Sequence, residues 1–237
     1  MLRTIALSLP LLALAMPAAA AEIQIQAQGP VVEISAAQAV QSAPDIATIS
    51  GGVTSRAATA VEAMRLNAAA MDKVIAALKK QGIEARDIQT SGISLNPQWR
   101  WNNDQSPPTF IGYDAGNRVS VILRDVARTG PVLDAMVAAG ANEISGPQFS
   151  LDDDSAARGV ARKAAFEKAG KQAADYARMA GYSSVRLLEV SEMLTGGGPI
   201  PYGRDAVMVQ SAAAKTPVEP GQVGTVVQVT VKYEMVK

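Results

Sequence analysis

The chain has no cysteine and no histidine among its 237 residues. It therefore cannot form a disulfide, a Ser-His-Asp or Cys-His nucleophile pair, or a zinc site with cysteine and histidine ligands. Catalysis would have to rely on carboxylates, lysine, tyrosine, serine, or a hard metal ion held by oxygen. The sequence predicts no catalytic, cofactor-binding or metal-binding residues, and favours a protein that is not an enzyme.

An excess of either charge is also missing, because 22 basic residues balance 22 acidic ones. Binding to a phosphate backbone needs a basic excess, so nucleic acid is not an expected partner. After the N-terminal segment no apolar run is long enough to cross a bilayer, and no membrane span is predicted there.

The N-terminal segment has the three parts of a signal peptide. Arg3 supplies a positive charge, an apolar run extends from Ile5 to Met16, and Pro17 leads into four alanines. A short apolar core with an A-x-A exit is typical of a cleavable secretory signal rather than a permanent membrane helix. We expect residues 1–21 to be removed and the mature chain to begin at Glu22.

The hydrophobic patterns in the rest of the chain predict one α+β domain over residues 22–237. Strands are expected near 32–35, 46–54, 93–99, 111–123, 145–151, 185–190 and 225–235. Helices are expected over 59–81, 125–139 and 152–180. Most strands alternate apolar and polar residues, which favours largely antiparallel sheets covered by long helices.

Two helices have patterns that predict which face packs. In the first, the expected apolar stripe is Val61, Met64, Ala68, Met71, Ile75 and Leu78. In the third, alanine recurs every four residues from 157 to 177, which would let the helix lie close against a sheet. The first two helices each end at a glycine that a strand follows, a weak internal repeat that suggests two related helix-on-sheet units.

Several short motifs each allow two interpretations. Asp152, Asp153 and Asp154 could bind a cation, but acidic capping of the next helix is favoured. Residues 196–221 contain three consecutive glycines followed by prolines, which predicts a mobile loop or contact arm rather than a phosphate site. Trp99 and Trp101 could stack on a sugar or peptide, although packing in a core or interface is favoured.

Two further residue types carry expectations. Asn117 lies on the apolar face of its strand, where a buried amide would need hydrogen-bond partners. Met64 and Met71 are expected in the core, and Met193 and Met208 are the predicted sites where oxidant could be absorbed as methionine sulfoxide.

Two runs of sequence carry a resemblance to a known family. Residues 110–119 read FIGYDAGNRV and residues 140–149 read GANEISGPQF. With Pro44, Asp45 and Ala47 and with the segments 82–90 and 158–180, they resemble the SIMPL-domain family of bacterial periplasmic proteins. That family includes an immunogenic periplasmic antigen and proteins linked to oxidative-stress defence.

The resemblance implies an α+β fold, a periplasmic location and a homo-oligomer, since at least one member builds a large ring. It implies no catalytic residue. The leading hypothesis is therefore a non-enzymatic, self-assembling envelope protein that contributes to oxidative or envelope stress defence. The alternatives are a periplasmic small-molecule-binding module with a closed apolar pocket, and a hydrolase with paired carboxylates of raised pKa.

Overall fold

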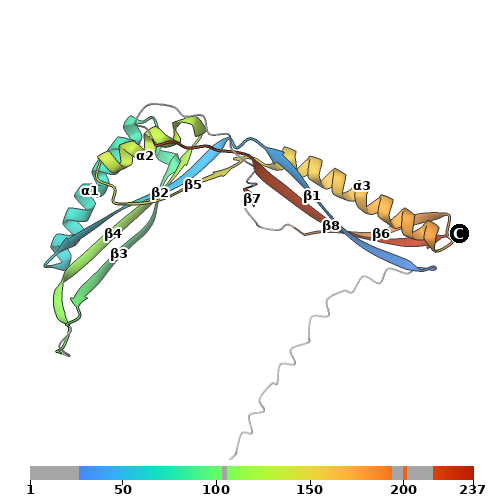
Figure 1. The fold of residues 1–237 in the computed structure, drawn as a ribbon, viewed down its shortest axis with the longest axis horizontal. Helices are drawn as coiled ribbons and strands as arrows, with labels where there is room; N and C mark the ends of the chain where they lie inside the picture. The colour runs from blue at the N-terminus through green and yellow to red at the C-terminus, as the bar shows by residue number, and fades with distance from the viewer. Residues whose placement is uncertain (1–26, 103–105, 194–199, 202–215) are drawn as a thin grey trace, which may run out of the picture.

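The computed structural model describes residues 27–102, 106–193, 200–201 and 216–237. They form two helix-covered antiparallel sheets that meet at a bend, with the helices on the outer side of the bend (Figure 1). The fold is α+β with antiparallel sheets, as the sequence predicts. We call the half built from the middle of the sequence the central unit, and the half built from both ends the terminal unit.

The central unit has the strand order β3-β4-β2-β5, and α1 and α2 cover one face of its sheet. Its elements are β2 (Ile46–Ala57), α1 (Ala60–Lys80), η1 (Ala85–Asp87), β3 (Ile88–Arg100), β4 (Thr109–Leu123), η2 (Val126–Arg128), α2 (Thr129–Ala138) and β5 (Glu143–Ser150). The fully buried side chains between sheet and helices include Ile49, Leu78, Val119, Val121, Val132 and Met136. Both helices of the predicted internal repeat, α1 and α2, lie over this one sheet rather than over two.

The buried stripe of α1 differs from the predicted one in the first half of the helix. The buried residues are Ala63, Asn67, Met71, Val74 and Leu78. Three residues expected in the stripe are exposed: Val61, Met64 and Ala68. The Asn67 amide explains the difference, because its Nδ2 donates to the carbonyls of Val53 and Ala115 at 2.7 and 2.9 Å. These two hydrogen bonds, one to each strand, thus set the rotation of the helix about its axis. Hydrophobic spacing alone does not reveal this rotation.

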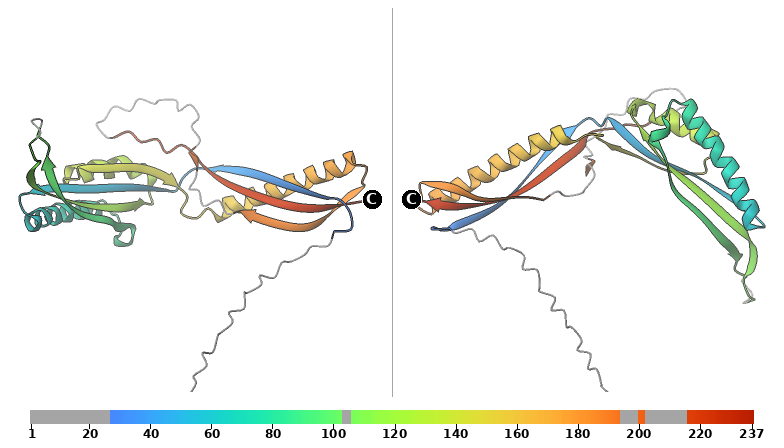
Figure 2. Two further views of the ribbon diagram at one scale, coloured as in Figure 1. Left: turned by 90° about the horizontal axis from the view of Figure 1, so that it is seen from below. Right: turned by 180° about the vertical axis from the view of Figure 1, so that it is seen from behind.

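The terminal unit joins the two ends of the chain in one sheet of order β1-β8-β6, covered by one helix (Figure 2). Its elements are β1 (Val31–Ser42), α3 (Ser155–Met179), β6 (Ser184–Met193), β7 (Ile200–Pro201) and β8 (Val223–Val236). As the four-residue repeat predicts, the alanines of α3 at 161, 165, 169, 173 and 177 are buried against β1 and β8. Small side chains there bring the helix axis close to the sheet.

Among the residues that the structure describes, three connections cross the bend and tie the units together. The β1–β2 connection meets the β5–α3 connection where the Asp152 backbone N–H donates to Asp45 Oδ1 at 2.7 Å. The third crossing precedes β8, where Thr216 Oγ1 donates to Asp134 Oδ1 at 2.6 Å and Val218 packs against the central core. Thr216 and Val218 of the predicted loop are therefore docked on the central unit, and β7 adds two strand residues. Residues 196–199 and 202–215 of that loop lie outside the described residues.

Candidate functional site

β3 is an edge strand, and one of its faces carries uncovered apolar side chains. Ile93, Leu95 and Trp99 are 61%, 40% and 53% exposed. Ile93 and Leu95 pair with residues of β4 that face α1, but the helix packs over β2 and β4 and leaves most of β3 uncovered. No strand pairs with the outer edge of β3 in the part of the chain that the structure describes. An edge with free N–H and C=O groups is a template for pairing with another chain.

The end of the β3–β4 hairpin carries a cluster of aromatic side chains. Trp99 meets Phe110 edge-to-face with ring centroids 5.2 Å apart, and Phe110 meets Tyr113 at the same distance. Trp101 follows the end of β3 and is 80% exposed. A hollow of about 540 Å³ lies here, lined by Pro97, Gln98, Trp99, Trp101 and Pro108. Packing in the protein core is therefore the wrong interpretation for both tryptophans, while contact with a ligand or a partner stays open.

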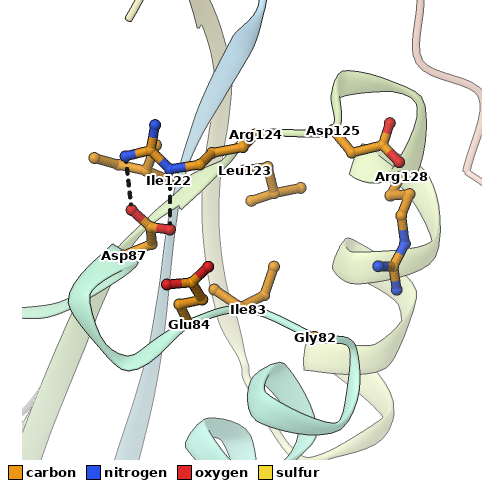
Figure 3. A pocket seen from close by; sticks show the side chains of 9 residues that line it. All are labelled: Gly82, Ile83, Glu84, Asp87, Ile122, Leu123, Arg124, Asp125 and Arg128. Atoms are coloured by element: carbon orange, nitrogen blue, oxygen red, sulfur yellow. Dashed lines mark hydrogen bonds and ion pairs between the residues drawn. The ribbon is translucent and has the colours of Figure 1, made fainter.

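A second cavity, of about 220 Å³, lies beside the bend, where α1 and β4 end (Figure 3). Arg124 forms two hydrogen bonds with the buried Asp87 carboxylate, at 3.0 and 3.2 Å. Its Nη1 also donates to Asp152 Oδ2 at 2.6 Å, across to the β5–α3 connection. Hydrogen bonds to Asp87 and Asp152 raise the pKa of Arg124 above its ordinary value. The guanidinium stays charged and acts as a clamp between the central unit and the connection to α3.

The resolved pKa shifts of the described carboxyl groups run opposite to the one that a general acid requires. Among the residues that the structure describes, every carboxyl with a resolved pKa shift is shifted downward: Glu62, Asp114, Glu143, Asp153, Glu192 and Glu234. Hydrogen bonds to the ionised form are the main cause in each case. A carboxylic acid that donates a proton near neutral pH needs the opposite shift. The geometry therefore gives the hydrolase alternative no support.

The three consecutive aspartates point to three different partners. Asp152 binds Arg124, and Asp154 binds Arg158 at 2.9 Å within α3. Asp153 Oδ1 accepts the Ser155 backbone N–H at 2.9 Å, which satisfies a free donor at the start of α3. Within the described ranges no group of three acidic residues is placed to hold a metal ion.

The methionines follow the sequence prediction only in part. Met71 is buried and Met193 is 66% exposed, as predicted, whereas Met208 lies outside the described residues. Met64 was expected in the core but is exposed, because Asn67 rotates α1. Met179 is 80% exposed at the end of α3 and was not predicted as an exposed thioether. Met179 lies two residues after Ala177, off the four-residue repeat that is buried, and this spacing could have predicted its exposure.

The asparagine that hydrogen-bonds helix to sheet is Asn67, whereas the sequence predicts Asn117 as the buried structural amide. Asn117 lies in β4 opposite Val53, but its buried Oδ1 has no hydrogen-bond partner among the described residues. Asn67 in α1 was missed, and it makes the two hydrogen bonds that link helix and sheet. An asparagine spaced four residues from both Ala63 and Met71 was the available signal.

The model of the SIMPL family, described as a protein of unknown function (DUF541), matches residues 32–233. The chain belongs to the SIMPL family. It is 34% identical over 220 residues to the 26 kDa periplasmic immunogenic protein of Brucella melitensis biotype 1, covering 90% of this chain and 88% of that relative. It is 30% identical to the uncharacterized protein YggE of Escherichia coli K12, covering 63% of this chain and 60% of YggE. YggE of Edwardsiella ictaluri is 27% identical, covering 80% of each chain.

The names of these relatives bear on where in the cell the protein is found. The Brucella relatives of this SIMPL protein are named periplasmic, and none of the names of the relatives given above denotes an enzyme. In the part of the chain with described structure, no helix has the length and apolar character needed to cross a bilayer. Residues 1–21 lie outside that part, so their removal as a signal peptide stays a prediction.

Glu234 gives this SIMPL protein a predicted pH dependence. Its carboxylate accepts hydrogen bonds from Arg186 and from the backbone N–H groups of Gln28 and Gly29, and these lower its pKa. A depressed folded-state pKa stabilises the fold fully above the unfolded pKa of about 4.3, and this contribution is lost as pH falls through the folded value.

Glu234→Gln should therefore lower the Tm at pH 7, and the difference from wild type should shrink as pH falls below about 4. Thermal melts across pH, with the exposed Glu167→Gln as control, measure this. A Tm difference that stays constant down to acid pH would contradict the assignment.

Proposed function

We propose that this chain is a non-enzymatic periplasmic protein that assembles with copies of itself and contributes to oxidative or envelope stress defence. The observation that carries the proposal is the uncovered apolar edge strand β3. The terminal unit also ends in edge strands, β1 and β6, on the other side of the bend. A contact between unlike edges of successive copies is head-to-tail, and it closes into a ring when its rotation allows.

The proposal includes two features outside the described residues. Residues 1–21 are removed on export, which leaves Glu22 as the mature N-terminus. Residues 196–199 and 202–215, the parts of the predicted arm 196–221 without described structure, act as a contact between copies, whereas Thr216 and Val218 contact the central unit.

Self-assembly is tested by charging the β3 edge of the mature chain, residues 22–237. Ile93→Lys combined with Leu95→Lys should reduce the particle mass from an oligomer to a monomer, because two ammonium groups cannot be buried without partners. Light scattering over a wide concentration range measures the mass. Ser94→Lys is the control, since it adds one positive charge to the opposite face of the same strand and should leave the oligomer intact.

A wild-type chain that is monomeric at every concentration would overturn the assembly proposal. A wild-type oligomer that both the double variant and Ser94→Lys leave unchanged would instead place the contact away from β3. If instead the wild-type chain is monomeric, a binding-module function becomes the stronger alternative.

The stress-defence part rests on exposed thioethers. Peroxide should convert Met179 and Met193 to sulfoxide well before the buried Met71 and Met136, because thioether oxidation follows access. Each thioether takes one oxygen atom from one peroxide, which is reduced to water. Peptide mass spectrometry over a time course measures the order. Equal rates at all four residues would contradict the burial pattern and remove this support.

A further inference from the structure

We propose that the aromatic hollow at the end of the β3–β4 hairpin binds an oligosaccharide built of pyranose rings. The hollow is lined by Trp99 and Trp101, bordered by Pro97 and Pro108, and contains the half-buried Gln98. It lies beyond the Ile93 and Leu95 segment proposed for self-assembly, so the two surfaces can be tested separately.

The platform is held in place before any ligand arrives. The Trp99 ring is fixed by its edge-to-face contact with Phe110, which is fixed in turn by Tyr113. Rings and proline borders that are already held in place reduce the conformational entropy that is lost when a ligand binds. Trp101, by contrast, is 80% exposed and presents most of its ring to solvent.

Asn102, which follows β3, connects the end of this strand with the residues that lead into β4. Its Nδ2 lies 2.9 Å from Ser106 Oγ, 2.9 Å from the Pro107 carbonyl oxygen and 3.2 Å from Thr109 Oγ1. These contacts join the end of β3 to the start of β4.

The chemistry of the lining favours a neutral ligand with an apolar face and a polar rim. None of the five lining residues that the structure describes is charged, which gives no basis for selecting a phosphate or a nucleic acid. A pyranose ring stacks its C–H face on an aromatic ring and offers hydroxyl groups to an amide such as that of Gln98. Two tryptophans in one lining offer two aromatic faces, which suits neighbouring rings of a sugar chain.

Two other occupants fit less well. A hairpin that inserts into lipid needs an apolar tip, but residues 102–106 read NNDQS and include an aspartate. A purely apolar protein surface would cover Gln98 and leave its amide without a partner. A lipid surface and a second protein are therefore treated as outcomes of the test.

The test is titration calorimetry of residues 22–237 with three sugars: chitotetraose, cellotetraose and maltotetraose. At least one should bind with a Kd on the order of 0.1–1 mM, as expected for a shallow open site. Trp101→Ala should weaken that binding at least about tenfold, and Trp99→Ala should do the same. Trp101→Ala should keep the wild-type Tm, because its ring is mostly exposed. The Ile93→Lys, Leu95→Lys variant should keep its sugar affinity whatever its particle mass.

Absence of binding by all three sugars up to about 10 mM would overturn the proposal. So would equal affinity in wild type and Trp101→Ala. A Trp101→Ala variant that loses particle mass without any sugar binding in the wild type would reassign the hollow to contacts between copies. Loss of binding to anionic or zwitterionic lipid vesicles in the same variant, again without sugar binding, would reassign it to a membrane surface.

Discussion

Met136→Ala is expected to destabilise the central unit by about 2–5 kcal/mol, the range for truncating a buried methionine. Met136 lies in α2 and is fully buried. A Cβ atom placed on Gly51 would lie 1.9 Å from the Met136 Cε, so the methionine tip fills the space that a side chain on β2 would occupy. Removing it leaves a cavity above a residue that has no side chain to fill it.

The same contact supplies a compensation test. Gly51→Ala alone should destabilise by forcing the Met136 tip aside, whereas Gly51→Ala in the Met136→Ala background should recover part of the lost stability. Urea unfolding followed by tryptophan fluorescence measures each free energy of unfolding. Val137→Ala is the matched control on the exposed side of α2, and should change stability by less than about 0.5 kcal/mol. Additive effects of the two core substitutions would show that they do not share a space.

Ala169→Leu should destabilise the terminal unit by about 1–3 kcal/mol or more, because it inserts a large side chain between α3 and its sheet. Ala169 is fully buried in the middle of the alanine stripe, against residues of β1 and β8. At the next position, a Cβ on Gly170 would lie 3.3 Å from the Tyr233 hydroxyl oxygen, which indicates how closely helix and sheet approach.

Hydrogen exchange distinguishes a local effect from a global one. Amide protection should fall in α3, β1 and β8, and should be preserved in α1, β2 and β4, because each unit has its own core. Ala156→Leu, at an exposed position in the first turn of α3, should leave protection unchanged. Equal loss of protection in both units would show that they unfold as one.

The sequence could predict those parts of the candidate site that depend on residues close together along the chain, and not those that depend on residues far apart. The tryptophan pair is visible in the sequence, but its exposure follows from the position of β3 at the sheet edge, and strand order is set by non-local pairing. Likewise Asn67 was missed because its two acceptors belong to strands that the sequence does not place beside it. The docking of Thr216 and Val218 depends on the central unit, including Asp134 of α2, which is remote along the chain.

The sequence by itself determined the order of the helices and strands apart from β7, the antiparallel α+β class, the alanine face of α3 and the absence of cysteine and histidine chemistry. Each depends on local periodicity or on composition. Only the tertiary structure decided the rotation of α1, the division into two sheets joined at a bend, the Arg124 clamp and the uncovered face of β3. These follow from contacts between residues far apart in sequence, such as Arg124 with Asp152, whose energies appear only when the chain brings the partners together.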